Sequence, residues 1–268
     1  MFTPFLHKWG INMDYNYHTH TYMCNHAEPS MEEYIKRAID NGIKYMGFSE
    51  HIPFVFPDGF VSHFRISFED TDKYISELKE LREKYKDVID IKIGFEMEYY
   101  PKYFDEMLEI AKKYKAEYLI LGQHFIGNQH PDGYWSGRET DNEEILKEYV
   151  STVVTAIKSG VFTYVAHPDL INYTGDEKLY ISEMSKLCKV SLEYNVPLEI
   201  NFLGIRDNRS YPRELFWKIA GEIKSPVTFG FDAHDVMSAY DEDSLEKAKE
   251  LVEKYNLNYI GKAEIKSI

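Results

Sequence analysis

Ten histidines occur in this chain of 268 residues, and seven of them are expected at or just after the ends of predicted strands. Neutral imidazole nitrogens and carboxylate oxygens are ligands that zinc, iron and manganese favour. His18 and His20 form an H-x-H pair, and strand spacing projects both side chains to the same side. Asp232 and His234 repeat this spacing as a D-x-H pair opposite the first. These residue types and spacings predict a site for divalent metal ions.

The other candidate ligands share this placement near the carboxyl ends of predicted strands. They are His26 in the loop after the first strand, His51, Glu96, His124 and His167. A single buried histidine is more often a core residue than a ligand, but seven at corresponding positions favour a metal site. The remaining histidines, His7, His63 and His130, are expected to be solvated loop residues.

Alternating strands and helices must position these side chains. The expected strands are Tyr15–His18, Tyr45–Ser49, Ile91–Glu96, Tyr118–Gly122, Phe162–Ala166, Leu198–Asn201 and Val227–Phe231. The expected helices are Met31–Asn41, Glu69–Tyr85, Tyr103–Lys115, Glu143–Gly160, Glu177–Tyr194, Arg213–Ala220 and Ser244–Tyr255. This alternation, without a linker or repeat, predicts one α/β domain over residues 1–268, with a parallel, closed or nearly closed sheet ringed by helices. The carboxyl ends of such strands open onto one face, where all nine candidate ligands would meet.

Two long segments interrupt this alternation, Ile52–Ser67 and Phe125–Asn142. Both contain a Pro-Asp-Gly turn signal and mix aromatic residues with an arginine. Long ordered loops after barrel strands commonly determine substrate specificity. The alternative is that they only decorate the surface.

Composition limits the classes of partner. The formal net charge of −14 and the pI near 5.2 oppose nucleic-acid binding, so an anionic substrate would need local attraction from metal ions or a few arginines. No run of 18 apolar residues predicts a membrane span, and the amino terminus does not resemble a signal peptide. Cys24 and Cys188 form no C-x-x-C pair. A cytoplasmic location is expected, and the oligomeric state is left open.

The motifs resemble the polymerase and histidinol phosphatase (PHP) superfamily over nearly the whole chain. They are HTHT (His18–Thr21), SEH (Ser49–His51), GFE (Gly94–Glu96), His124, AHPD (Ala166–Asp169) and GFDAHD (Gly230–Asp235). The resemblance implies a distorted (β/α)7 TIM-like barrel. It also implies two to three divalent metal ions, which could be zinc, iron or manganese.

The resemblance also implies which residues hold each ion. The first ion would be held by His18, His20, Glu96 and Asp232, the second by Glu96, His124 and His167, and the third by His26, His51 and His234. Glu96 would thus bridge two ions. Glu98 lies two residues further along the same strand face and is the competing choice for the bridge.

Within the superfamily, the chain length and the EMEYYP stretch (Glu96–Pro101) are most similar to histidinol-phosphate phosphatases. This similarity implies hydrolysis of L-histidinol phosphate in histidine biosynthesis. Arg206 matches a position expected to contact phosphate, whereas the arginine expected near Asn172 is absent. Arg138 is a weaker candidate for phosphate and is expected to serve as a surface residue.

Catalytic and substrate-binding roles follow from this reading. We expect Glu96 to hold two ions together, and Asp232 or His234, or a water on a metal ion, to supply the proton for the leaving alkoxide. The aromatic residues Phe64, Tyr134 and Trp135 in the long loops could pack on the substrate's ring.

Three alternatives remain open at this point. The substrate could be another small phosphate ester, such as a nucleotide or a sugar phosphate. The chain could instead be a non-catalytic metal-binding module or work beside a polymerase, although all nine motif positions are filled. A metal-dependent amidohydrolase also uses H-x-H on a barrel, but such enzymes often add a lysine at a strand end, and none is expected here.

Overall fold

The structure is a computed structural model that describes residues 13–24, 27 and 31–268. The expectations for His7 and His26 therefore concern residues outside the described part of the chain.

Eight strands form one parallel sheet in the order β1-β2-β3-β4-β7-β8-β9-β10. Their bounds are β1 (Tyr15–Asn16), β2 (Tyr45–His51), β3 (Asp90–Met97), β4 (Tyr118–Leu121), β7 (Phe162–Val165), β8 (Leu198–Asn201), β9 (Pro226–Gly230) and β10 (Asn258–Tyr259). Seven of them correspond to the predicted strands. β10 was not predicted, because a two-residue strand of Asn and Tyr has no apolar pattern to reveal it.

The sheet curls until its two ends meet near the carboxyl ends of the strands. Beyond β1 and β9, Thr19 bridges Ala233 in parallel, with His20 N donating to Ala233 O at 2.9 Å and Ala233 N donating to His18 O at 3.3 Å. At the amino end of β9, Pro226 and Val227 pair with β10 and not with β1. The result is the distorted TIM-like barrel that the sequence predicted. The placement of the D-x-H pair opposite the H-x-H pair was wrong, because this bridge makes the two pairs neighbours.

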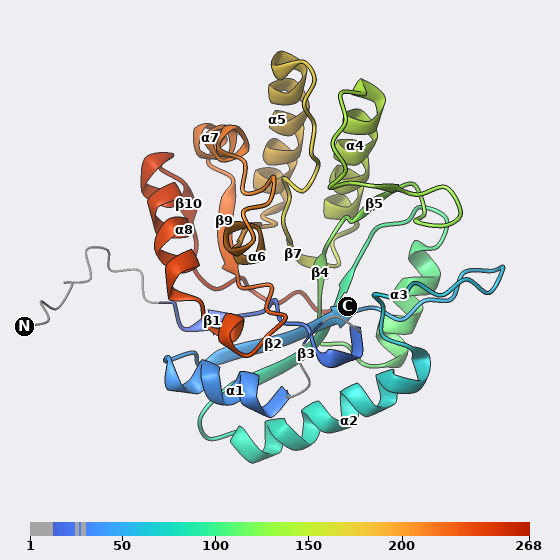
Figure 1. The fold of residues 1–268 in the computed structure, drawn as a ribbon, viewed down its shortest axis with the longest axis vertical. Helices are drawn as coiled ribbons and strands as arrows, with labels where there is room; N and C mark the ends of the chain where they lie inside the picture. Colours follow the sequence, from blue (N-terminus) through green and yellow to red (C-terminus); the bar gives the residue numbers. More distant parts are fainter. Residues whose placement is uncertain (1–12, 25–26, 28–30) are drawn as a thin grey trace, which may run out of the picture.

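Helices cover the outside of the sheet (Figure 1). They are α1 (Met31–Asp40), α2 (Phe68–Tyr85), α3 (Phe104–Lys113), α4 (Glu143–Ser159), α5 (Glu177–Tyr194), α7 (Glu214–Ile223) and α8 (Glu242–Lys254). Side chains of Ser67, Asn142, Asp176 and Asp241 accept backbone N–H bonds at the amino ends of α2, α4, α5 and α8. The short helices η1 (Tyr22–Cys24), α6 (Phe202–Arg206) and η2 (Met237–Ala239) were not predicted. None of the described helices is long and apolar enough to cross a lipid bilayer.

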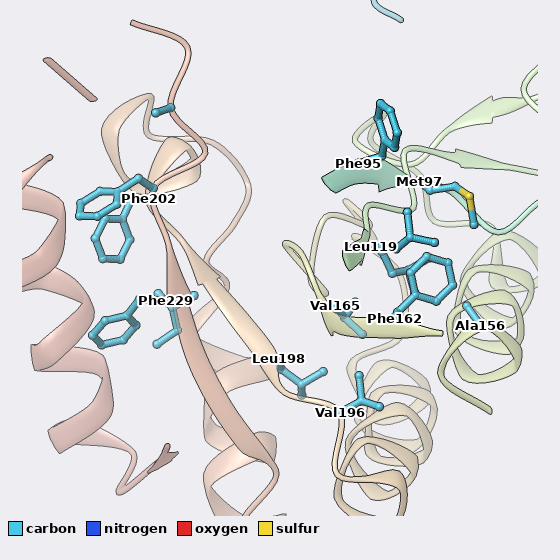
Figure 2. Packing of buried hydrophobic residues seen from close by; sticks show 14 of the residues in the cluster. Phe95, Met97, Leu119, Ala156, Phe162, Val165, Val196, Leu198, Phe202 and Phe229 are labelled. Atoms are coloured by element: carbon cyan, nitrogen blue, oxygen red, sulfur yellow. The ribbon is translucent and has the colours of Figure 1, made fainter. Parts of the chain in front are cut away.

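Apolar side chains fill the space between the sheet and the helices. Leu119 on β4 pairs with Phe162 on β7, and Figure 2 shows both beside Ala156 of α4. A smaller cluster that includes Tyr17, Tyr118 and Tyr164 is separate from this layer. The packed core keeps the strand ends in fixed relative positions, as a metal site requires. The assignment of the entire chain to one domain stays a prediction.

Both long segments have local order that the sequence did not reveal. In residues 52–67, Val55 bridges Val61 across the Pro-Asp-Gly turn. In residues 125–142, β5 (Phe125–Ile126) pairs antiparallel with β6 (Tyr134–Trp135). These segments follow β2 and β4, so they stand at the same mouth of the barrel as the candidate ligands.

Candidate metal centre

The structure brings eight of the nine candidate ligands together at the carboxyl ends of the strands. They are His18, His20, His51, Glu96, His124, His167, Asp232 and His234, and all except the partly exposed His234 are buried. The ninth, His26, lies outside the described residues. The strands of a curled parallel sheet all point their carboxyl ends to one mouth, which explains why residues so far apart in sequence converge.

The carboxylate of Glu96 lies at the centre of the cluster. Its Oε2 is 3.3 Å from His20 Nε2, 3.2 Å from His51 Nδ1 and 3.6 Å from His18 Nε2, and its Oε1 is 3.1 Å from His167 Nε2 and 3.5 Å from His124 Nε2. A Cβ on Gly122, directly after β4, would lie 1.8 Å from Glu96 Oε1, so any other residue there would displace this carboxylate. Glu96 therefore has the position that a ligand shared between two ions requires.

Asp232 closes the cluster on the side of β9. Its Oδ1 lies 3.5 Å from Nε2 of both His18 and His20 and 3.4 Å from His234 Nδ1, while its Oδ2 accepts a 3.0 Å bond from Asn201 Nδ2. Asp232 has a φ of +47°, and His167 has a φ of +32°. Non-glycine residues rarely adopt such backbone angles, and they persist where surrounding contacts hold them, often at functional sites.

Four overlapping groups of three side chains have ligand atoms within 4.8 Å of one another. They are His20, His51 and His234; His18, His20 and Glu96; His18, His167 and Asp232; and His51, Glu96 and His124. The separations suit ions that share ligands. The second group falls within the predicted first ion site, and His51 with His234 recurs in the predicted third.

Three buried glutamates lie behind the histidines. Glu199 Oε1 is 2.8 Å from His18 Nδ1, Glu98 Oε1 is 3.1 Å from His124 Nδ1, and Glu50 Oε1 is 3.4 Å from His20 Nδ1. An ionised carboxylate can only accept, so in the neutral imidazoles these contacts place the proton on Nδ1 and leave the Nε2 lone pair facing the cluster. Glu98, considered in the sequence as the bridge, instead supports His124.

Sequence reasoning missed Glu50 and Glu199. Both were visible as acidic residues within otherwise apolar or motif-bearing strands, at SEH and LEIN. A charged residue in a buried strand needs a partner, and that is the signal that could have identified them.

The protonation of the metal-free cluster follows from its buried carboxylates. Burial acts to lower the pKa of His18, but the charges of Asp232, Glu199 and Glu96 raise it well above its ordinary value. Burial likewise opposes ionisation of Glu96, but the neighbouring imidazoles, His124 first, hold its pKa well below the usual range. In His51, burial and the charge of His20 lower the pKa well below 6.5. Without metal, protons on some imidazoles compensate the carboxylates.

The donor set fits divalent cations. Five carboxylates are buried in or against the cluster, those of Glu50, Glu96, Glu98, Glu199 and Asp232, whereas Arg65 is the buried arginine beside them. Buried charges are costly unless they are paired or bind metal ions. Within the described residues, buried Glu96 Oε2 approaches imidazole nitrogens without a hydrogen bond of good geometry, and buried His167 Nδ1 has no hydrogen-bond partner. These observations, together with the nitrogen and oxygen donors, fit a site for divalent metal ions.

Arg206, predicted to contact phosphate, and Arg138, the weaker candidate, both lie outside the lining of the cavity above the cluster. Arg206 donates to Phe231 O at 3.1 Å, Asp232 O at 3.0 Å and Asp241 Oδ2 at 3.2 Å, and it does not line the cavity above the cluster. It supports the backbone that carries Asp232. Arg138 is exposed over the ring of Tyr134, as the surface reading expected.

A cavity of about 860 Å³ opens above the cluster. Phe64, Phe125 and Trp135 form one wall, which we call the aromatic wall, and Trp135 stacks on His124 with ring centroids 5.8 Å apart. The lining also includes polar and charged residues, Asp207, Arg209, Tyr211 and Asp235. His63 also lines the cavity, although the sequence reading placed it among solvated loop residues. The cavity thus joins metal ligands to a surface suited to a flat ring.

The chain is similar to known proteins in both sequence and fold. The model of the PHP domain family matches residues 16–202. The histidinol-phosphatase of Bacillus subtilis is 25% identical over 264 residues, covering 84% of this chain and 96% of that protein. A probable histidinol-phosphatase of Deinococcus radiodurans is 24% identical over 225 residues, covering 81% and 85%. The crystal structure of histidinol phosphate phosphatase from Lactococcus lactis, with zinc, L-histidinol and phosphate, superimposes with a TM-score of 0.70 at 21% identity, covering 92% and 95%.

Proposed function

The chain belongs to the PHP domain family, and from that premise we propose that it is a metal-dependent phosphomonoesterase that converts L-histidinol phosphate to L-histidinol and phosphate. The observation that carries the proposal is the cluster of imidazoles and carboxylates at the base of a cavity with an aromatic wall. The names of the relatives, and the zinc, histidinol and phosphate bound by the Lactococcus lactis protein, support the same substrate.

We assign the ions as the family resemblance implies. One would be held by His18, His20, Glu96 and Asp232, a second by Glu96, His124 and His167, and a third by His51, His234 and His26. When bound, such ions supply Lewis acidity, which neutralises charge on a phosphoryl group and makes water nucleophilic near neutral pH. Zinc, iron and manganese all suit this donor set, so the metal and the number of ions belong to the proposal.

The protein's own residues orient this chemistry. Glu199, Glu50 and Glu98 hold protons at Nδ1 of three histidines, so that each presents Nε2 inward. Asp232 and His234 stay our candidates for delivering a proton to the leaving alkoxide. Of the two, His234 is the more accessible, since its side chain is 16% exposed and lines the cavity.

We assign the contact with phosphate to Arg209 rather than to Arg206. Arg209 lines the cavity, and its guanidinium donates to Asp207 Oδ2 at 2.8 Å and to Tyr211 OH at 3.3 Å. An arginine fork suits phosphate oxygens. Arg206 donates to backbone carbonyls instead, so we assign it the support of Asp232.

The lining of the cavity suits the two ends of histidinol. The aromatic wall offers ring faces to an imidazole, and the carboxylates of Asp207 and Asp235 suit its ammonium group. A net charge of −14 would repel a free phosphate ester at long range, so local cations must attract it. The prediction that nucleic acid is not a partner rests on the same charge.

Phosphate release tests the proposal. Protein loaded separately with zinc, iron or manganese should hydrolyse L-histidinol phosphate, lose activity on chelation and regain it when the metal returns. Sugar phosphates and nucleotides serve as competing substrates in the same assay. Faster hydrolysis of one of them would replace histidinol phosphate by the second candidate, another small phosphate ester.

A further inference from the structure

Among the described residues, Arg65 is the one buried arginine, and its side chain is 0% exposed. It lies near the end of the loop of residues 52–67, directly after Phe64 of the aromatic wall. Burying a guanidinium costs free energy unless it is paired and hydrogen-bonded. The sequence predicted a role in substrate specificity for this loop. Arg65 itself neither lines the cavity nor belongs to the candidate ligands.

The donors of Arg65 reach three separate segments of the chain. Nη1 donates to Ile52 O at 3.1 Å, at the start of its own loop. Nη2 donates to Glu98 Oε2 at 2.6 Å, just beyond β3. Nε and Nη2 donate to Gln129 Oε1 at 3.3 and 3.2 Å, in the loop of residues 125–142. Gln129 Nε2 returns to the first loop through a 2.7 Å bond to Ser62 Oγ.

Glu98 uses its two oxygens for different tasks. Oε2 accepts from Arg65, and Oε1 lies 3.1 Å from His124 Nδ1. His124 Nε2 points to the cluster, 3.5 Å from Glu96 Oε1. The chain of contacts therefore runs from both long loops, through one guanidinium and one carboxylate, to a single candidate ligand.

We propose that Arg65 is a positioning residue that fixes both long loops to the carboxylate orienting His124. The inference rests on the proposed metal site, and it goes further because it couples the order of the substrate loops to the affinity for metal at His124. The planar fork matters here, since lysine offers a single point of charge and cannot reach all these acceptors in one plane.

The test uses zinc as the probe and four variants of the full chain. R65M removes the guanidinium, E98Q removes the carboxylate charge, and R65M/E98Q removes both. R82M is the matched control, because Arg82 pairs with Glu117, which lies before β4 at the opposite end of the barrel. Zinc affinity is measured per chain against a chelator buffer, and amide hydrogen exchange is measured in both loops.

R65M should bind one zinc ion about 10–100-fold more weakly than the parent protein. The amide hydrogens of both loops should exchange faster in this variant. E98Q should weaken zinc similarly but leave the loops protected, because Arg65 keeps its bonds to Ile52 and Gln129. R65M/E98Q should bind zinc no more weakly than E98Q. Zinc affinity of R65M equal to that of R82M, or losses that multiply in R65M/E98Q, would overturn the proposal.

A variant that fails to fold is replaced by R65K, which keeps the charge. R65K should show intermediate zinc affinity and faster exchange in the second loop, and parent-like values for both would contradict the proposal. The parent protein separates this inference from the function proposed above. If the parent binds no zinc, the metal site itself is wrong, whereas zinc binding by the parent with an unaffected R65M removes only the role of Arg65.

Discussion

The Nδ1 atom of His18 lies 2.8 Å from Oε1 of Glu199, and both side chains are fully buried. Glu199 Oε2 also accepts from His167 N at 3.1 Å and Asn201 Nδ2 at 3.0 Å. One carboxylate thus supports two candidate ligands from different strands. A Cβ on Gly230 of β9 would lie 1.6 Å from Glu199 Oε1, so any other residue there would displace this carboxylate.

Glu199→Gln should weaken zinc binding about 10–100-fold, the usual cost of losing an outer carboxylate behind a histidine ligand. The amide cannot accept on both sides at once, so either His18 or His167 N loses its acceptor. Zinc per chain in a chelator buffer measures the effect. Glu183→Gln on α5 is the control, since Glu183 is buried but pairs with Lys186 far from the cluster. Equal zinc affinity in the two variants would contradict the role of Glu199.

The Glu96→Gln variant should retain fewer bound metal ions per chain than the Glu98→Gln variant. Glu96 approaches five imidazoles and can serve two ions, whereas Glu98 supports His124 from behind. Metal analysis should show loss of most bound ions in the first variant and a weakened single ion in the second. Metal content in Glu96→Gln equal to that of the parent would refute Glu96 as the bridge.

The stability of the metal-free protein should depend on pH above neutrality. Burial opposes protonation of His20, but bonds to Glu50 and Glu96 raise its pKa to about 9 from the ordinary value of 6.5. A raised folded-state pKa contributes stability that is complete below 6.5 and is lost as pH rises towards 9. The direction is the same for His18 and His124.

Thermal unfolding checks this dependence. The Tm of the metal-free protein should fall as pH rises from 6.5 to 9. The fall should be roughly 2–4 °C for each kcal/mol by which the free energy of unfolding decreases. The zinc-loaded protein should show a smaller fall, because ligating imidazoles are already neutral. A flat Tm of the metal-free protein over this range would show that these histidines are not protonated in the folded state.

Arg209→Ala and Arg206→Ala should have different effects. Loss of Arg209 should lower kcat/KM, mainly by raising KM. The expected factor corresponds to about 1.5–3 kcal/mol of lost binding free energy, the contribution of a charge-assisted hydrogen bond. Loss of Arg206 should instead reduce metal retention, because the carbonyls of Phe231 and Asp232 lose their donor. Steady-state kinetics with metal analysis distinguish the two. A raised KM with full metal content in Arg206→Ala would restore the phosphate contact that the sequence suggested.

The candidate ligands could be predicted because residue type and position along a strand are both local features. Glu96 and His167 each directly follow apolar residues, His51 follows such residues after Ser49 and Glu50, and parallel strands place such ends together. The fold class followed from the same alternation of strands and helices.

Other features depend on long-range contacts that no spacing encodes. The pairing of Thr19 with Ala233 joins segments more than 200 residues apart and decides which ligands are neighbours. Arg206 follows a strand, as a phosphate contact would, but its side chain turns back to the end of β9. Glu98 could bridge or support, and only the position of Arg65 and His124 around it distinguishes these roles.

The ratio of kcat/KM for L-histidinol phosphate to that for a generic aryl phosphate, measured on the zinc-loaded protein, tests the central claim most directly. A generic aryl phosphate has a phosphoryl group, a ring and a better leaving group but no ammonium group, whereas histidinol phosphate also engages the acidic residues of the cavity. We expect a ratio of at least about ten, since the charge contact contributes at least about 1.5 kcal/mol. A ratio near one would contradict the assignment to histidinol phosphate and leave only a metal-dependent phosphoesterase.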